Sequence, residues 1–172
     1  REYNLTPTTL KQIYPSANPA AISYILKYAP IYGVITKKQM AAFLATVLVE
    51  SMGFKATRES FNYKPERLLK VFPSRVKTLS NAVTLCAKGP VAIANFLYNG
   101  RYGNSATGDD GFKYRGGGWI QTTFKDNYRA TESRTGIPLS TQPELIEQMD
   151  VATIAAFDYW KNRGCNEAAS AI

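Results

Sequence analysis

Helix start and stop signals recur along most of this chain, and they constrain its fold more than any other feature. Thr36 and Gln39 form a capping box ahead of an apolar run, and Gly53 stands where that helix should stop. Asn18 followed by Pro19 marks another helix start, with Asn18 as the N-cap. Because such signals divide the chain into short helical segments, the sequence predicts a mainly α domain.

The same signals predict helices in several further segments, at about residues 6–16, 64–72, 89–98, 124–136 and 150–164. We expect Asp150 to cap the last of these. Between the helices lies a glycine-rich stretch, residues 103–123. Its core, FKYRGGGWIQTT, has the aromatic and β-branched residues of a small β-hairpin or an extended loop. At 172 residues the chain fits one domain, residues 1–172.

The chain has no histidine, which narrows the chemistry that it can perform. Ser-His-Asp and Cys-His nucleophile systems are excluded in their usual forms, and so are metal sites that depend on histidine ligands. An enzyme with this composition must move protons through Asp, Glu, Lys, Tyr or water. The two cysteines, Cys86 and Cys165, lack a second ligand at metal-binding spacing; we expect free thiols, with a single bridge as the alternative.

The net charge is +8, from 21 Lys and Arg against 13 Asp and Glu. Such a surface attracts polyanions, which include nucleic acid, anionic membranes and anionic cell-wall polymers. The basic residues are dispersed and no nucleic-acid recognition motif is present, so nucleic acid is disfavoured. The longest apolar stretch is too short for a membrane span, so no stable membrane insertion is expected.

Glu50 lies at the end of the apolar run that follows Thr36. At 100° per residue it points in nearly the same direction as Phe43, on the shoulder of the face formed by Met40, Phe43, Leu44, Val47 and Leu48. This pattern predicts a carboxylate partly withdrawn from water, with a raised pKa suited to a general acid. The alternative is that Glu50 points to solvent at a fraying helix end.

Glu59 comes nine residues later, beyond the stop signal at Gly53. The neighbouring cations Arg58 and Lys55 would favour its ionised form, unless Arg58 and Glu59 are an ordinary surface pair. Two-carboxylate glycoside hydrolysis uses one carboxylic acid with a raised pKa and one ionised carboxylate. In an inverting enzyme the two carboxyl groups lie about 6.5 to 9.5 Å apart.

The glycine-rich stretch adds candidate ligand-binding groups around its three consecutive glycines, residues 116–118. Aromatic faces and polar side chains near them suit a sugar-binding groove, although a structural turn with packed aromatics is equally compatible with the pattern. The candidates for sugar contact are Tyr114, Trp119, Gln121, Thr122, Thr123 and Arg115.

Four ordered motifs between about residues 40 and 160 carry a resemblance to a known family. They are AAFLATVLVESMGF, TRESFNYKPERLLKVFP, GDDGFKYRGGGWIQTTFKDNY and QPELIEQMDVATIAAFDYW. In this order they resemble the family 19 glycoside hydrolases, a chitinase-like group that includes many bacteriophage endolysins. The resemblance implies a lysozyme-like, two-lobed helical fold with a long cleft. It also implies inversion at the anomeric carbon, with no metal and no cofactor.

The resemblance also implies roles for individual residues. Glu50 matches the general acid and Glu59 matches the general base that activates water. Thr123 matches the hydroxyl residue that helps to hold this water, and Gln121 and Asn127 match side chains that contact substrate.

The sequence departs from the family pattern in two places. Many relatives carry His directly before the first Glu, where this chain has Val49. Relatives also usually continue into an Asn/Gly/Arg-rich segment after the last helix, whereas this chain stops at CNEAASAI. Either that contribution to the cleft is absent or the chain is a fragment trimmed at its C-terminus.

Three functions are compatible with these features. The first is a phage or bacterial endolysin that cuts the β-1,4 bond of peptidoglycan; it is favoured by the positive charge, since bacterial envelopes are polyanionic. The second is the same chemistry on chitin, and the third is a non-catalytic module that binds glycan or nucleic acid. For the first we expect a monomer that stays in the host cytoplasm until its release to the wall, because no signal peptide is visible.

Overall fold

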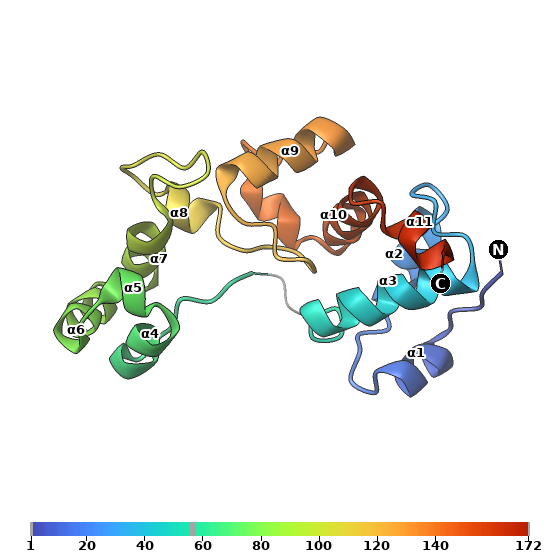
Figure 1. Ribbon diagram of the computed structural model, residues 1–172, viewed down its shortest axis with the longest axis horizontal. Coiled ribbons are helices and arrows are strands. Elements are labelled where there is room, and N and C mark those ends of the chain that lie inside the picture. The colour runs from blue at the N-terminus through green and yellow to red at the C-terminus, as the bar shows by residue number, and fades with distance from the viewer. Residues whose placement is uncertain (1, 56–57, 172) are drawn as a thin grey trace.

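A computed structural model describes residues 2–55 and 58–171 of the chain. Short helices joined by loops make up most of it (Figure 1). The helices are α1 (Pro7–Ile13), α2 (Ala21–Tyr28), α3 (Lys37–Glu50), α4 (Pro65–Val71), α5 (Pro73–Val76), α6 (Leu79–Lys88), α7 (Pro90–Tyr98), α8 (Asp110–Lys113), α9 (Lys125–Thr135), the 3-10 helix η1 (Pro143–Glu147), α10 (Met149–Asn162) and α11 (Cys165–Ser170). The mainly α prediction is confirmed. No described helix is long and apolar enough to cross a bilayer.

The helices gather into two lobes at opposite ends of the molecule, with α9 and η1 between them (Figure 1). The larger lobe packs α1, α2, α3 and α10 around a core that contains Phe43, Phe157 and Trp160. The smaller lobe packs α4 to α7 around Leu68, Ile93 and Leu97 and other apolar side chains. A third cluster joins α9, η1 and α10 to the glycine-rich stretch. The two-lobed architecture expected from the sequence is therefore present.

Helix α3 begins and ends by local capping chemistry. The Gln39 amide donates to Thr36 Oγ1 at 3.1 Å, and the Thr36 amide donates to Gln39 Oε1 at 3.0 Å, so the predicted capping box is formed. At the other end the Gly53 amide donates to the Leu48 carbonyl at 2.8 Å. Met52 already has a φ of 51°, so the left-handed turn begins one residue before Gly53. This reversal ends α3 at Glu50.

Two predicted helix starts are displaced in the structure. Helix α2 begins at Ala21, and the side chain of Asn18 instead accepts a hydrogen bond from the Ala20 amide at 3.1 Å in the preceding turn. Helix α10 begins at Met149, so Asp150 lies in its first turn rather than at its cap. In both cases the capping side chain is close to the helix start but bonds a neighbouring amide.

The glycine-rich stretch folds back on itself without forming a named strand in the described part of the chain. Gly117 and Thr122 exchange two backbone hydrogen bonds, at 2.9 and 2.8 Å. Gly117 also forms a bridge to Arg58, in the crossing segment, residues 58–64, which leads into α4 of the smaller lobe (Figure 1). Of the expected β-hairpin only the Gly117–Thr122 bridge is present within the stretch, which is otherwise the extended loop given as the alternative.

Cys86 and Cys165 are both free thiols, Cys86 in α6 and Cys165 at the start of α11. The expectation of free thiols is therefore confirmed.

Of the three consecutive glycines, residues 116–118, Gly117 has the least space for a side chain. A Cβ there would lie 2.4 Å from Ile146 Cγ2 and 2.7 Å from the Tyr128 hydroxyl oxygen, and both of these side chains are fully buried. Gly117→Ala should therefore lower the free energy of unfolding by about 1 to 3 kcal/mol, the usual cost of overpacking a core. Denaturant unfolding measures this change. Gly136→Ala is a less crowded comparison, because a Cβ added there would have no atom within 4 Å, although the φ of 78° adds strain. A Gly117→Ala protein as stable as the unmodified chain would contradict this account of the loop.

Candidate functional site

Glu50 is the last residue of α3, at the end of the helix that faces the crossing segment (Figure 1). The apolar face predicted for this helix is confirmed, since Phe43, Val47 and Leu48 are buried. Glu50 itself is exposed, so the prediction that it is partly withdrawn from water is wrong, and the alternative, that it points to solvent at the helix end, is correct. The physical reason is the end of the helix: beyond Glu50 the chain turns away, and no further turn of α3 covers the carboxylate.

Glu59 is half-buried on the crossing segment, and both of its carboxylate oxygens are held. The Tyr98 hydroxyl donates to Oε2 at 2.8 Å, and the Gly116 amide donates to Oε1 at 3.1 Å. The Glu59 amide in turn donates to the Gly116 carbonyl at 2.7 Å. Hydrogen bonds to a charged acceptor are stronger than neutral ones, so these contacts fix the direction of the carboxylate.

Tyr98 reaches Glu59 from the end of α7, in the smaller lobe, and is itself buried. Burial, together with the negative charge of Glu59 and the hydrogen bond to it, raises the pKa of the Tyr98 hydroxyl well above its ordinary value of 10. The hydroxyl therefore remains a donor throughout the neutral range.

Arg58 was expected to favour the ionised form of the neighbouring Glu59, but its side chain contacts the glycine-rich stretch. Its Nη2 donates to the Lys113 carbonyl at 2.9 Å, and its Nη1 lies 3.8 Å from Glu147 Oε1. The side chain thus ties the crossing segment to α8 and η1.

Gln121 lies against the same glycine as Glu59. A Cβ on Gly116 would lie 2.6 Å from Gln121 Oε1 and 3.3 Å from Glu59 Oε1, so a side chain there would displace the Gln121 amide from this point. Gln121 has a φ of 53°, uncommon for a residue with a side chain, and its Nε2 donates to the Gly118 carbonyl at 2.9 Å. Backbone strain of this kind is frequent at functional sites.

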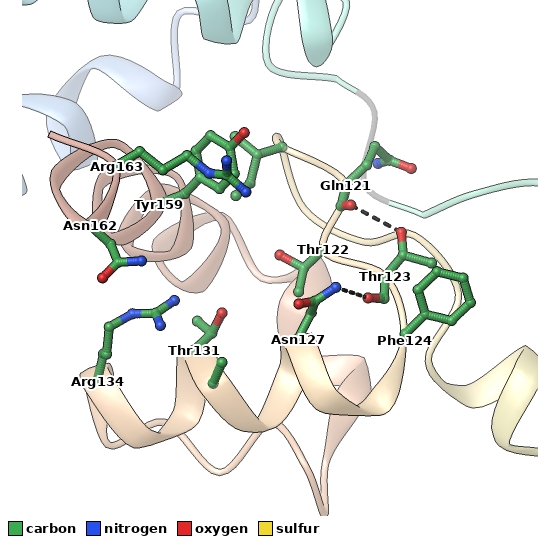
Figure 2. Close-up of a pocket in the computed structure, with 12 residues that line it drawn as sticks. Gln121, Thr122, Thr123, Phe124, Asn127, Thr131, Arg134, Tyr159, Asn162 and Arg163 are labelled. Carbon is green, nitrogen blue, oxygen red and sulfur yellow. Dashed lines mark hydrogen bonds between the residues drawn. The ribbon is translucent and has the colours of Figure 1, made fainter. Parts of the chain in front are cut away.

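Thr123 and Asn127 continue from Gln121 along one line of hydrogen bonds (Figure 2). Thr123 Oγ1 donates to the Gln121 carbonyl at 3.0 Å, and Asn127 Nδ2 donates to the Thr123 carbonyl at 2.8 Å. The structure therefore brings Glu59, Gln121, Thr123 and Asn127 into one region.

A pocket of about 410 Å³ opens beside these residues, between the glycine-rich stretch, α9 and α10 (Figure 2). We call it the α9–α10 pocket. Its wall is formed by Ile120, Gln121, Thr122, Thr123, Phe124, Asn127, Ala130, Thr131, Arg134, Tyr159, Asn162 and Arg163. Gln121, Thr123 and Asn127, all predicted from the sequence, are among these residues. Among residues 2–55 and 58–171, no group of three His, Cys, Asp or Glu side chains is placed to hold a metal ion.

Comparison with known proteins decides the family. The chain is 32% identical, over 162 residues, to a glycosyl hydrolase family 19 domain-containing protein from Haemophilus influenzae. The matched region covers 91% of this chain and 78% of the relative. The chain belongs to glycosyl hydrolase family 19. It is therefore a glycoside hydrolase, whose substrate is a glycan chain.

Two other comparisons are less informative. No family model matches the sequence. A crystal structure of a chitinase C mutant aligns with a TM-score of 0.49 and 18% identity. The alignment covers 90% of this chain but only 53% of the chitinase, so this family 19 chain spans about half the length of that protein.

Two predicted sugar-binding aromatics lie elsewhere. Trp119 is 1% exposed and packs against Phe54 with ring centroids 4.7 Å apart. Tyr114 is 5% exposed, donates its hydroxyl to the Ser140 carbonyl and packs against Tyr128. Neither ring presents a face to the α9–α10 pocket, and both hold the loop to the cores. The aromatic residues Tyr114 and Trp119 therefore pack in the protein interior.

Sequence reasoning missed Tyr98 and the polar residues that α9 and α10 add to the pocket, among them Arg134 and Arg163. Tyr98 lies 39 residues from Glu59, and nothing in the local pattern links the two. In the sequence Arg163 is only a cation at a helix end, and its place on the pocket wall depends on how α9 and α10 pack.

The Tyr98 hydroxyl is expected to matter for turnover through Glu59. Tyr98→Phe removes a donor to a charged oxygen and should lower kcat by about tenfold or more on any glycan that the enzyme cleaves. The aromatic core is kept, so the melting temperature should change little. Steady-state kinetics and thermal unfolding measure both quantities. Tyr63→Phe is the control, because no hydrogen bond of that hydroxyl is present in the described part of the chain; equal kinetics for both variants would contradict the role of Tyr98.

Proposed function

We propose that this family 19 enzyme is a peptidoglycan hydrolase of the endolysin type. It would cut the β-1,4 bond between N-acetylmuramic acid and N-acetylglucosamine. The observation that carries the proposal is the anchored carboxylate of Glu59, held by Tyr98 and Gly116 beside Gln121. Family membership supplies the reaction class in which such a carboxylate is useful.

In the proposed mechanism Glu50 protonates the glycosidic oxygen as the general acid. Its exposed position at the end of α3 leaves it accessible to the leaving group. Glu59 acts as the general base on the opposite side of the sugar. Each of its oxygens accepts one hydrogen bond from the protein and keeps a lone pair for a water proton.

Thr123 and Gln121 complete the proposed site. The Thr123 hydroxyl donates to a backbone carbonyl, so its oxygen can still accept a hydrogen bond and orient the attacking water. Gln121 and Asn127 would contact the substrate beside it. Attack by water opposite the departing sugar inverts the anomeric carbon, which is the outcome that two separated carboxylates produce.

The charge of the chain favours peptidoglycan over chitin. The net charge of +8 attracts an anionic wall polymer, while chitin carries no acidic substituent to be attracted. An enzyme of this type would act as a monomer, and would accumulate inside the host until it is released to the wall.

The acid assignment is tested with Glu50→Gln. The variant should lose at least about 100-fold in kcat, the smallest effect typical of a positioned general acid. Its fold should be unchanged, because Glu50 is exposed. Glu66→Gln is the matched control, since Glu66 is an exposed carboxylate in the first turn of α4. Activity of Glu50→Gln within a few-fold of the unmodified enzyme would show that Glu50 is not the acid.

The substrate is tested by two assays on the same preparation. One measures clearing of outer-membrane-stripped bacteria, and the other measures cleavage of a soluble chitin oligomer. Clearing without chitin cleavage is the expected result. Chitin cleavage without clearing would contradict the proposed substrate and leave the carboxylate mechanism in place.

A further inference from the structure

The α9–α10 pocket carries two arginines on the side away from Gln121 and Thr123 (Figure 2). Arg134 comes from α9, and Arg163 is the C-cap residue of α10. The pocket therefore joins the proposed catalytic residues to a region that contains two positive charges.

Arg134 is already neutralised within the protein. Its Nε lies 3.0 and 2.9 Å from the two carboxylate oxygens of Asp158, and its Nη2 lies 2.9 Å from Oδ2. The Asp158 side chain is only 8% exposed, so this ion pair is part of the packed α9–α10 interface. The pair contributes little net charge to the pocket.

Arg163 differs, because it makes no ion pair with residues 2–55 or 58–171. Its guanidinium carbon lies 4.3 Å from the centre of the Tyr159 ring, an arrangement that orients the group by cation–π attraction. The guanidinium has five N–H donors, and none of them makes a hydrogen bond to residues 2–55 or 58–171. A cation at the C-terminal end of α10 also interacts favourably with the helix dipole. If this were the only interaction of Arg163, its role would be purely structural.

We propose that the α9–α10 pocket binds a carboxylate carried by the glycan, with Arg163 as the cation that receives it. The inference rests on the proposed function and narrows it to a feature of the substrate. Peptidoglycan has such a group on every second sugar, either the lactyl carboxylate itself or a carboxylate of the attached peptide. Chitin has neither, so the pocket would discriminate between the two polymers.

The chemistry of the pocket suits this ligand. A planar guanidinium donates two parallel hydrogen bonds to a carboxylate, which an ammonium group cannot do. The Asn162 side chain lies beside it on the wall and adds amide hydrogen-bonding groups. A volume of about 410 Å³ exceeds that of a carboxylate alone and leaves room for the substituent that carries it.

The inference is tested by binding in a Glu50→Gln background, which prevents turnover. The probes are a disaccharide of N-acetylglucosamine and N-acetylmuramic acid, the same disaccharide with its lactyl carboxylate converted to the amide, and the disaccharide with its peptide attached. The acid should bind roughly tenfold more tightly than the amide, as expected for a hydrogen-bonded charge. Adding Arg163→Gln should abolish this preference.

Lys161→Gln is the matched control, because it removes the same charge from the same end of α10 outside the pocket. It should keep the preference for the acid. A preference seen with the bare disaccharide assigns the lactyl carboxylate, and one that needs the peptide assigns a peptide carboxylate; either result supports the proposal. If Arg163→Gln weakens all probes equally, or if no probe shows a preference for the acid, Arg163 has only a structural role and the proposal is overturned.

These outcomes are separate from those of the proposed function. An enzyme that clears walls but shows no preference for the acid keeps the proposed function and loses this inference. An enzyme that binds the acid preferentially through Arg163 but does not clear walls keeps the inference and loses the proposed function.

Discussion

The pairing between Glu59 and Gly116 is the interaction on which the rest of the site depends. It consists of a backbone hydrogen bond in one direction and a backbone-to-carboxylate hydrogen bond in the other. This pairing attaches the crossing segment to the glycine-rich stretch. It also orients the Glu59 carboxylate. Tyr98 adds a contact from the smaller lobe, so three parts of the chain that are distant in sequence meet at one side chain.

Glycine leaves space for two side chains at this meeting point. Side chains of Glu59 and Gln121 both approach the Cα of Gly116, and Gly117 lies against Ile146 and Tyr128 on its other side. The loop thus has one surface packed into a core and another open to the α9–α10 pocket. A rigid packed support behind a polar surface is how proteins hold catalytic groups in place.

Much of this arrangement could be predicted from the sequence, because its signals are local. The capping box at Thr36 and the apolar face of α3 depend on residues three and four apart, and both are present. The exposure of Glu50 could be given only as an alternative, since it depends on the path that the chain takes beyond the helix end. Tyr98 and Arg163 are brought to the site by the packing of helices that are far apart in the sequence. Such packing produces no periodic pattern in the sequence. Trp119 is a related case. It is buried, because an aromatic residue beside glycines packs in a core as readily as it stacks on a sugar.

The central claim is that Glu50 and Glu59 act as a separated acid and base across the sugar. The anomeric form of the first product tests this most directly, because it is set by the side from which the attacking group arrives. Proton NMR during the first minutes of hydrolysis, before mutarotation, should show the α-anomer at the new reducing end. Appearance of the β-anomer first would mean retention through a covalent intermediate, and would contradict the roles given to both carboxylates.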